Sequence, residues 1–297
     1  MHYLFALAIA PVIFLLSYVK KKDPNPEPKD LLRKIFIFGC LTIIPAVILE
    51  NVYSAFFIGE KEVESFADIF FGVALIEEFV KWIVVYVICF KNKHFDETYD
   101  AIVYAAYSAL AFACIENILY VLLDEDGAGI FVGIMRAFTA VPGHLFDGVI
   151  MGYYFAKARS AKAQNRSAFG LLLCSLFVPA FVHGIYDWLL EIEAILIWLV
   201  FFIGIAIFCI SLIKSAAKKN VAISDGIATP VAQPATQPVT PIQPVTQPVQ
   251  QPAQQPVAPQ PTPQPTEQPA TSPTQQISYD WGTPAEQPSN QTNQPQN

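Results

Sequence analysis

The chain has 297 residues, of which 54% are hydrophobic and only 14% charged, and its formal net charge is −7 at pH 7. Soluble domains average about 25% charged residues, and a soluble core of this size could not hide 23 phenylalanines. The composition therefore excludes a soluble enzyme. The negative charge argues against nucleic-acid binding, because the chain has no excess of basic residues to neutralise phosphates. We expect a polytopic membrane protein.

Apolar runs of about 20 residues, long enough to cross a bilayer, recur along the first 220 residues. An all-α fold is expected, a polytopic membrane bundle of about seven transmembrane helices. The first run is followed by lysines instead of being preceded by them, which favours an uncleaved helix with its N-terminus outside. The predicted helices are approximately Tyr3–Val19, Ile35–Tyr53, Asp68–Phe90, Ala101–Leu123, Arg136–Ala156, Ala168–Leu190 and Ala194–Ile213.

The basic residues agree with this number of helices. Fifteen of the 18 lysines and arginines fall in alternate loops or after the last helix. Seven spans would place all fifteen on one side of the membrane, which the positive-inside rule identifies as the cytoplasm. The sequence therefore predicts an N-terminus outside and a C-terminus in the cytoplasm.

The composition changes near Asn220. Residues 221–297 contain 17 of the 24 prolines, 17 glutamines and no lysine or arginine, and such a segment cannot bury enough apolar surface to offset the entropy of ordering it. We predict a transmembrane domain over residues 1–219 and a disordered Pro/Gln/Thr-rich cytoplasmic tail over residues 220–297. The tail is expected to be a passive spacer. The alternative is an arm that binds proline-recognising domains, anchored by Ser278–Trp281.

Polar side chains concentrate in four successive predicted helices, the third to the sixth. Ionisable groups at membrane depth are costly unless they are paired or face a cavity, so they indicate function. The other three helices carry no ionisable group in their central turns. The polar residues are Glu77, Glu78 and Lys81; Glu116 and Asn117; His144 and Asp147; and His183 and Asp187.

Helical spacing shows which of these groups can meet. Lys81 follows Glu77 by four residues and Glu78 by three, so it can pair with either carboxylate. His183 and Asp187 lie four residues apart on one face. Separate structural pairs are the plainer interpretation, since an ion pair in a membrane helix often serves packing alone. Three glutamates and two histidines on four helices are costly unless they share a site, and we favour a common functional centre.

Spacing also predicts the depth of this centre. One polar residue on each helix lies eight or nine positions from a charged residue taken to mark the outer boundary, which is about 12–14 Å at 1.5 Å per helical residue. The centre would then lie in the outer half of the bilayer, where water reaches it from outside. The polar residues are Glu77, Glu116, His144 and His183, and their boundary residues are, in the same order, Asp68, Asp124, Arg136 and Glu191.

The ordered set of motifs resembles the PrsW family of bacterial intramembrane proteases, a relative of the CAAX-prenyl-protease and bacteriocin-immunity superfamily. The shared patterns are EExxK, FxxxEN and HxxxD, with a looser Pro-Gly-His element before the last of them. The resemblance covers the third to the sixth predicted helix. The residues that carry it are Glu77-Glu78-Phe79-Val80-Lys81, Phe112-Ala113-Cys114-Ile115-Glu116-Asn117, Pro142-Gly143-His144 and His183-Gly184-Ile185-Tyr186-Asp187.

The resemblance implies a peptidase of the bacterial plasma membrane. Its substrate would be a single-pass membrane protein, typically an anti-sigma factor that receives its first (site-1) cut in an envelope-stress response. The glutamates and histidines would be the catalytic set. The expected catalytic residues are Glu77, Glu78, Glu116, His144 and His183, and the expected supporting residues are Lys81, Asn117, Asp147 and Asp187.

Peptide hydrolysis needs an activated water and a group that stabilises the oxyanion. Without a metal, Glu77 or Glu78 would be the general base, and Lys81 would keep the other carboxylate ionised. The histidines would polarise the carbonyl or protonate the leaving amine, with Asp187 fixing one tautomer. With a metal, two histidines and a glutamate resemble a catalytic zinc site, although no HExxH is present. The sequence leaves both mechanisms open, and the candidate ligands for zinc or another divalent metal are His144, His183, Glu78 and Glu116.

Two other classes of protein fit part of this pattern. Buried carboxylates and histidines also form the proton relays of transporters, but the two halves of the chain show no obvious inverted repeat. A non-catalytic immunity or scaffold protein could also retain the fold. The clustering in four helices favours the protease.

Overall fold

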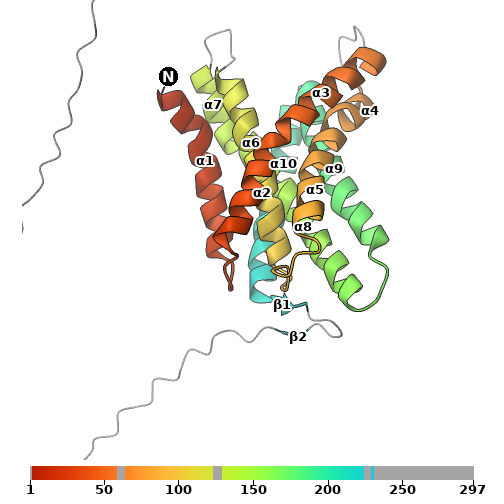
Figure 1. Ribbon diagram of the computed structural model, residues 1–297. Helices are drawn as coiled ribbons and strands as arrows, with labels where there is room; N and C mark the ends of the chain where they lie inside the picture. Colours follow the sequence, from red (N-terminus) through yellow and green to blue (C-terminus); the bar gives the residue numbers. More distant parts are fainter. Residues whose placement is uncertain (1, 59–63, 123–128, 224–228, 231–297) are drawn as a thin grey trace, which may run out of the picture. The chain divides into compact units, whose positions relative to one another are not determined.

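The computed structural model describes residues 2–58, 64–122, 129–223 and 229–230 (Figure 1). They form ten α-helices, two short π-helical turns and a two-stranded antiparallel ladder. The elements are α1 (His2–Lys21), α2 (Lys29–Leu41), α3 (Ile43–Tyr53), η1 (Ser54–Ile58), α4 (Phe66–Ile69), η2 (Phe70–Ala74), α5 (Leu75–Ile88), α6 (Asp100–Leu122), α7 (Gly129–Phe138), α8 (Ala140–Ala163), α9 (Phe169–Glu191), α10 (Ile195–Lys218), β1 (Val221–Ala222) and β2 (Thr229–Pro230).

The helical membrane bundle predicted from hydropathy is confirmed. All seven predicted spans are helical. Two of them are not among the five segments given below: α1, and the run from α4 to α5, which carries three charged residues in its centre. Of the predicted tail, only residues 220–223 and 229–230 belong to the described part of the chain, so the two-part domain organisation stays a prediction. Among the residues that the structure describes, five segments are long and apolar enough to cross a bilayer, namely Lys29–Ile58, Asp100–Leu122, Gly129–Ala163, Phe169–Glu191 and Ile195–Lys218.

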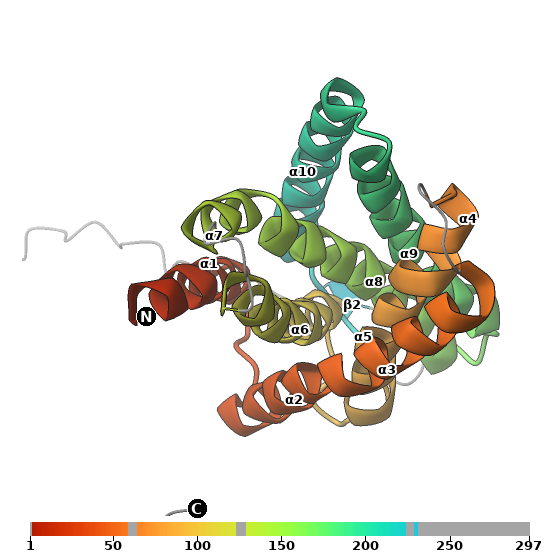
Figure 2. The same ribbon diagram turned by 90° about the horizontal axis from the view of Figure 1, so that it is seen from above.

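Helix α6 lies between α1, α2 and α8 when the bundle is viewed along its axis (Figure 2). Its many alanines let neighbouring backbones approach closely. One such close approach is at Gly152 of α8, where a Cβ atom would lie 2.6 Å from both the carbonyl oxygen of Ala101 and the Cα of Ile102. Because α6 carries Glu116 and α8 carries His144, this tight packing sets the distance between two of the predicted site residues.

The predicted helix Asp68–Phe90 begins two residues earlier and is not regular throughout. It is capped by Ser65, whose hydroxyl accepts from the backbone N–H of Asp68, while the Asp68 carboxylate accepts from the N–H of Ser65. The π-helical turn η2 then interrupts the helix immediately before the turn that carries Glu77 and Glu78. A π-turn adds a residue to the helix and rotates everything after it. The direction in which the two glutamates point therefore depends on this turn.

Where the sequence predicted one helix over Arg136–Ala156, the structure has α7 from Gly129 and α8 to Ala163, separated at Thr139, whose φ and ψ of −123° and −74° are not helical. Pro142 consequently lies in the first turn of α8, where its missing N–H removes no hydrogen bond, and not at a mid-helix kink. The break also means that Arg136 is near the end of the preceding helix, α7. Its use as a marker of the outer boundary was wrong, and Asp124, a second marker, lies outside the described residues.

At the other end of the bundle, the chain after α10 folds back onto the loop between α5 and α6. The side-chain oxygen of Asn220 accepts from the backbone N–H of Tyr99 at 2.9 Å, and the carbonyl of Val221 accepts from the N–H of Thr98 at 3.0 Å. The side-chain amide of Asn220 also donates to Glu97. These bonds fasten the end of α10 to the beginning of α6.

The contact at Gly152 leads to a prediction about stability. Replacing Gly152 with Ala would force α6 and α8 apart, because a Cβ has no room there, and overpacking of this kind costs about 1–3 kcal/mol. We expect a lower midpoint of thermal unfolding in detergent. The matched control is Gly204→Ala in α10, where an added Cβ meets nothing within 4 Å and alanine is the better helix former. Equal midpoints for the two variants would show that the contact is not tight.

Candidate active site

The site is built around Lys81, whose side chain is completely buried on α5. Its Nζ lies 2.8 Å from Glu77 Oε2 and 2.8 Å from Glu78 Oε1. Both carboxylates lie on the preceding turn, at positions i−4 and i−3, so the helix itself brings them to the ammonium group. Lys81 therefore pairs with both glutamates at once.

Helix α6 supports Lys81 on its apolar side. The ring centroid of Phe112 is 4.2 Å from Lys81 Nζ, a separation at which an ammonium group is attracted to the face of the ring. The hydroxyl of Ser108 donates to the carbonyl of Lys81 at 2.9 Å. Phe112 and Ser108 are themselves fully buried. The phenylalanine of the FxxxEN pattern thus has a physical role, which is to hold the lysine toward the acidic groups.

His144 of α8 connects Lys81 to Glu116 of α6. Its Nδ1 lies 3.0 Å from Lys81 Nζ, and its Nε2 lies 2.7 Å from Glu116 Oε2. The ammonium group can only donate, so Nδ1 must accept and Nε2 carries the proton that is donated to Glu116. This pattern corresponds to a neutral histidine in a single tautomer, held at both nitrogens.

His183 of α9 completes the cluster. Its Nδ1 lies 3.1 Å from Glu78 Oε1 and 3.9 Å from Asp147 Oδ2, and its Nε2 lies 3.1 Å from Asp187 Oδ2. The centroids of the rings of His183 and His144 are 5.4 Å apart, in an edge-to-face arrangement. The other oxygen of Glu78, Oε2, has no hydrogen-bond partner among the described residues. Each histidine therefore has one nitrogen facing the charged groups of α5. Its other nitrogen lies beside a carboxylate of another helix turn, Glu116 for His144 and Asp187 for His183; these two are the outer carboxylates.

Arg136 is the site residue that the sequence analysis missed. Its Nη2 lies 2.8 Å from Glu116 Oε2, its Nε donates to Asn117 Oδ1 at 2.9 Å, and its Cζ lies 3.9 Å from the ring centroid of Tyr120. Asn117 in turn donates to the carbonyl of Ala8 in α1 at 3.0 Å. An arginine near a predicted helix start resembles an interfacial residue. The only signal in the sequence for a place inside the site is its distance along the chain from Glu116 and Tyr120, which lets the following helix bring it back beside them.

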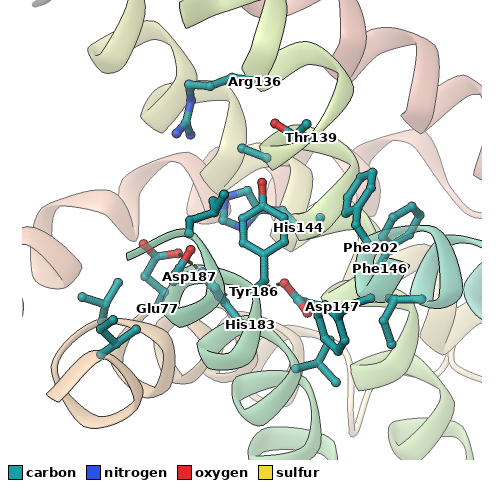
Figure 3. Close-up of a pocket in the computed structure, with 18 of the residues that line it drawn as sticks. Glu77, Arg136, Thr139, His144, Phe146, Asp147, His183, Tyr186, Asp187 and Phe202 are labelled. Carbon is teal, nitrogen blue, oxygen red and sulfur yellow. Dashed lines mark ion pairs between the residues drawn. The ribbon is translucent and has the colours of Figure 1, made fainter. Parts of the chain in front are cut away.

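A cavity of about 430 Å³ opens beside these residues (Figure 3). Glu77, His144 and His183 line it, whereas Glu78 and Lys81 do not. Glu64 and Glu191, which precede α4 and end α9, also line it, so it extends toward that end of the bundle. Aromatic side chains form part of its wall on α8, α9 and α10; they are Phe146, Tyr186, Phe201 and Phe202.

The cluster has the donor chemistry of a metal site. Glu77, Glu78, His144 and His183 each offer one ligand atom, and these atoms all lie within 4.8 Å of one another. Nitrogen and carboxylate ligands suit zinc and similar divalent ions. The Lys81 ammonium group lies among the same atoms, within 3.0 Å of three of the four residues. A metal ion would have to displace it. Glu116, a predicted ligand, is instead held by His144 and Arg136.

The structure thus brings together all five residues predicted to be catalytic, and it places three of the supporting residues around them. Lys81 is central, Asp187 contacts His183, and Asp147 lies within 4 Å of His183. Asn117 lies farther out, between Arg136 and α1. Which of these side chains take part in the chemistry stays a prediction.

Comparisons with known proteins agree with this geometry. Residues 27–213 match the model of the PrsW family of intramembrane metalloproteases. Protease PrsW of Geobacillus kaustophilus is 42% identical over 189 residues, which cover 63% of this chain and 79% of that one. Protease PrsW of Bacillus subtilis is 34% identical over 206 residues, 69% of this chain and 89% of that one. No solved structure matches.

The family match covers every helix that contributes to the cluster, α5 to α9, and it favours an enzyme over the transporter and scaffold alternatives. Its substrates, as for any intramembrane protease, are membrane proteins. The family match and the close relatives show that the chain is a multi-pass membrane protease that belongs to the PrsW family.

Proposed function

We propose that this chain is an endopeptidase that hydrolyses a peptide bond of a single-pass membrane protein, with Glu77 activating the attacking water. The observation that carries the proposal is that Glu77, His144 and His183 line one cavity. Of the two adjacent glutamates, only Glu77 faces this cavity; Glu78 is completely buried between Lys81 and His183. Glu77 is therefore the carboxylate that a water molecule in the cavity can reach.

The charge around Glu77 suits a base. Lys81 lies 2.8 Å from its Oε2, so an ammonium group faces the carboxylate. The same ammonium group binds Glu78 at 2.8 Å and is shared between the two adjacent carboxylates. Removing a general base typically lowers the rate by about 10²–10⁴-fold.

The two histidines are proposed to act on the scissile bond. His144 and His183 both line the cavity, and each is oriented by a carboxylate, Glu116 or Asp187. Such a carboxylate fixes the tautomer and stabilises the charged form when the ring takes up a proton. We assign His183 to the protonation of the leaving amine, because the Nδ1 atom of His144 is already occupied by the Lys81 ammonium group. His144 is assigned to polarisation of the carbonyl, for which its Nε2–H would have to turn from Glu116 to the substrate oxygen.

Four side chains with clustered ligand atoms, Glu77, Glu78, His144 and His183, would hold a divalent metal. A metal bound there would polarise the substrate carbonyl and make a coordinated water more acidic. Glu116 and Asp187 would then serve as the carboxylates behind the metal-binding histidines, an arrangement common in zinc sites. This function of the outer carboxylates needs no change in their contacts.

The substrate is proposed to be a single-pass membrane protein, and the family resemblance favours an anti-sigma factor cut in an envelope-stress response. The cavity extends toward Glu64 and Glu191, while the lysines that follow α1 and α10 lie at the opposite end. By the positive-inside rule the basic end is cytoplasmic. We infer a bacterial cell-membrane protein with its N-terminus outside, its active site open to the outside, and its tail in the cytoplasm, where it is available to proline-recognising domains.

Substitution of the cavity carboxylate tests the catalytic assignment. Glu77→Gln should lower cleavage of a membrane substrate by at least about 10²-fold without lowering the thermal midpoint in detergent, because a neutral amide is cheaper to bury than a carboxylate. The matched control is Glu50→Gln on α3, another carboxylate at membrane depth that does not line the cavity. Cleavage by purified enzyme is measured for both. Full activity of Glu77→Gln, or equal loss in both variants, would contradict the assignment.

Competition between Lys81 and a metal gives a second prediction. Since the ammonium group lies among the four potential ligands, Lys81→Met should bind Zn²⁺ more tightly than the wild type. Occupancy is measured by elemental analysis of purified protein after equilibration with Zn²⁺. Lys34→Met, an exposed lysine at the basic end, should match the wild type. Equal occupancy in all three proteins would show that the ammonium group and the metal do not share a position.

The position of the cut tests the orientation. With the cavity open to the outer side, the substrate should be cleaved at or beyond the outer boundary of its transmembrane span. Mass spectrometry of both fragments from a reconstituted reaction identifies the bond. A cut on the cytoplasmic side of the span would overturn the orientation while leaving the catalytic residues in place.

A further inference from the structure

A second cavity, of about 590 Å³, lies at the basic end of the bundle. It is formed where α8 and α10 end and where α6 and α9 begin, and the segment after α10 closes one side. No residue of the active-site cavity lines it. Its lining residues are Thr98, Ile102, Tyr153, Ala156, Lys157, Ser160, Ala161, Gln164, Arg166, Leu171, Leu212, Ser215, Ala216, Lys219 and Val221.

This cavity carries a concentrated positive charge. Lys157, Arg166 and Lys219 line it together with the hydroxyl groups of Ser160 and Ser215, and no lining residue is acidic. None of the three cations forms an ion pair with a carboxylate in the described part of the chain. Two helices begin and two end around the cavity, so their dipoles largely cancel, and the three side-chain charges set the potential.

The nearest acidic residue in the sequence does not neutralise this charge. Glu97 precedes Thr98, but its carboxylate accepts from the side-chain amides of Asn25 and Asn220. The Nζ of Lys157 lies 4.4 Å from the ring centroid of Tyr153. Within the described part of the chain, no carboxylate therefore competes with an external anion for the three cations.

We propose that this cavity binds the phosphate-bearing head group of an anionic membrane lipid. Clusters of lysine and arginine beside transmembrane helices bind phosphate head groups on the side of the membrane where they lie. Three cations and two hydroxyl groups supply the donors that a phosphodiester needs. Between them, Ile102, Leu171 and Leu212 give the cavity an apolar wall.

The apolar wall decides between a lipid and a free phosphate ion. A soluble anion would gain nothing from leucine and isoleucine side chains, whereas the first methylene groups of two acyl chains would be buried against them. The helix ends that form the cavity also lie where transmembrane segments meet the head-group region. An anionic glycerophospholipid matches both the cationic part and the apolar wall of the cavity.

Such a lipid would connect helices that also build the active site. Helix α8 contributes Phe146 and α10 contributes Phe202 to the catalytic cavity, and both helices line the second cavity at their other ends. A lipid that bridges Lys157 of α8 and Lys219 of α10 would fix the separation of these two helices. Bound lipid is therefore expected to raise thermal stability.

The test uses full-length protein, delipidated in a non-ionic detergent and titrated with phosphatidylglycerol, phosphatidylcholine or inorganic phosphate. Thermal midpoints and native mass spectra are recorded. One phosphatidylglycerol molecule should remain bound and raise the midpoint, whereas phosphatidylcholine and inorganic phosphate should not. The triple variant Lys157→Gln, Arg166→Gln, Lys219→Gln should lose affinity for phosphatidylglycerol by about a hundredfold.

The matched control removes the same charge elsewhere. Lys29, Lys91 and Lys214 are exposed and do not line the cavity, so their triple replacement by Gln should leave the affinity within about twofold. Ala216→Trp fills the apolar part without changing the charge and should also displace the lipid. The proposal is overturned if both triple variants lose affinity equally, or if inorganic phosphate stabilises the wild type as much as phosphatidylglycerol does.

Discussion

The charge of a lysine that is completely buried among membrane helices must be compensated by nearby groups. The arrangement of the active-site helices follows from the groups that compensate the charge of Lys81. Lys81 receives two carboxylates from its own helix, a histidine nitrogen from α8 and the face of Phe112 from α6. Removing both carboxylates would leave the ammonium group as an unpaired charge in a low-dielectric surrounding, which is far more costly than burying the ion pair. The separation of α5, α6 and α8 is therefore fixed by electrostatics as much as by packing.

Much of the fold and of the active site could be predicted from the sequence, because hydropathy and helical spacing are local features of the chain. Hydropathy gave the order of the helical segments but not their breaks, and i,i+3 and i,i+4 spacing gave the pairs of Lys81 with Glu77 and Glu78 and of His183 with Asp187. That the four helices share one site followed from the cost of burying so many ionisable groups. The sequence could not show which glutamate faces the cavity, since two adjacent residues differ only by about 100° around a helix.

The errors arose where the backbone departs from a regular helix. Helix boundaries inferred from hydropathy ignore the break at Thr139, and for that reason Arg136 was placed at the membrane surface instead of beside Glu116. The π-helical turn before Glu77 left no mark in the composition. Contacts between helices that are distant in sequence accompany both features: Arg136 bonds Asn117 near the break, and Gly72 of the π-helical turn lies against the ring of Tyr53. Tertiary context, and not local propensity, determines them.

The charge pairs of the active site are close together in the chain, and this bears on how the protein enters the membrane. Lys81 and its two glutamates share one helix, as do His183 and Asp187, so α5 and α9 carry much of their own compensation as they leave the ribosome. Glu116 has no cation on α6; its partner, Arg136, arrives with the next helix. A carboxylate alone in lipid is costly, so the nascent chain should insert α6 and α7 together, as a hairpin.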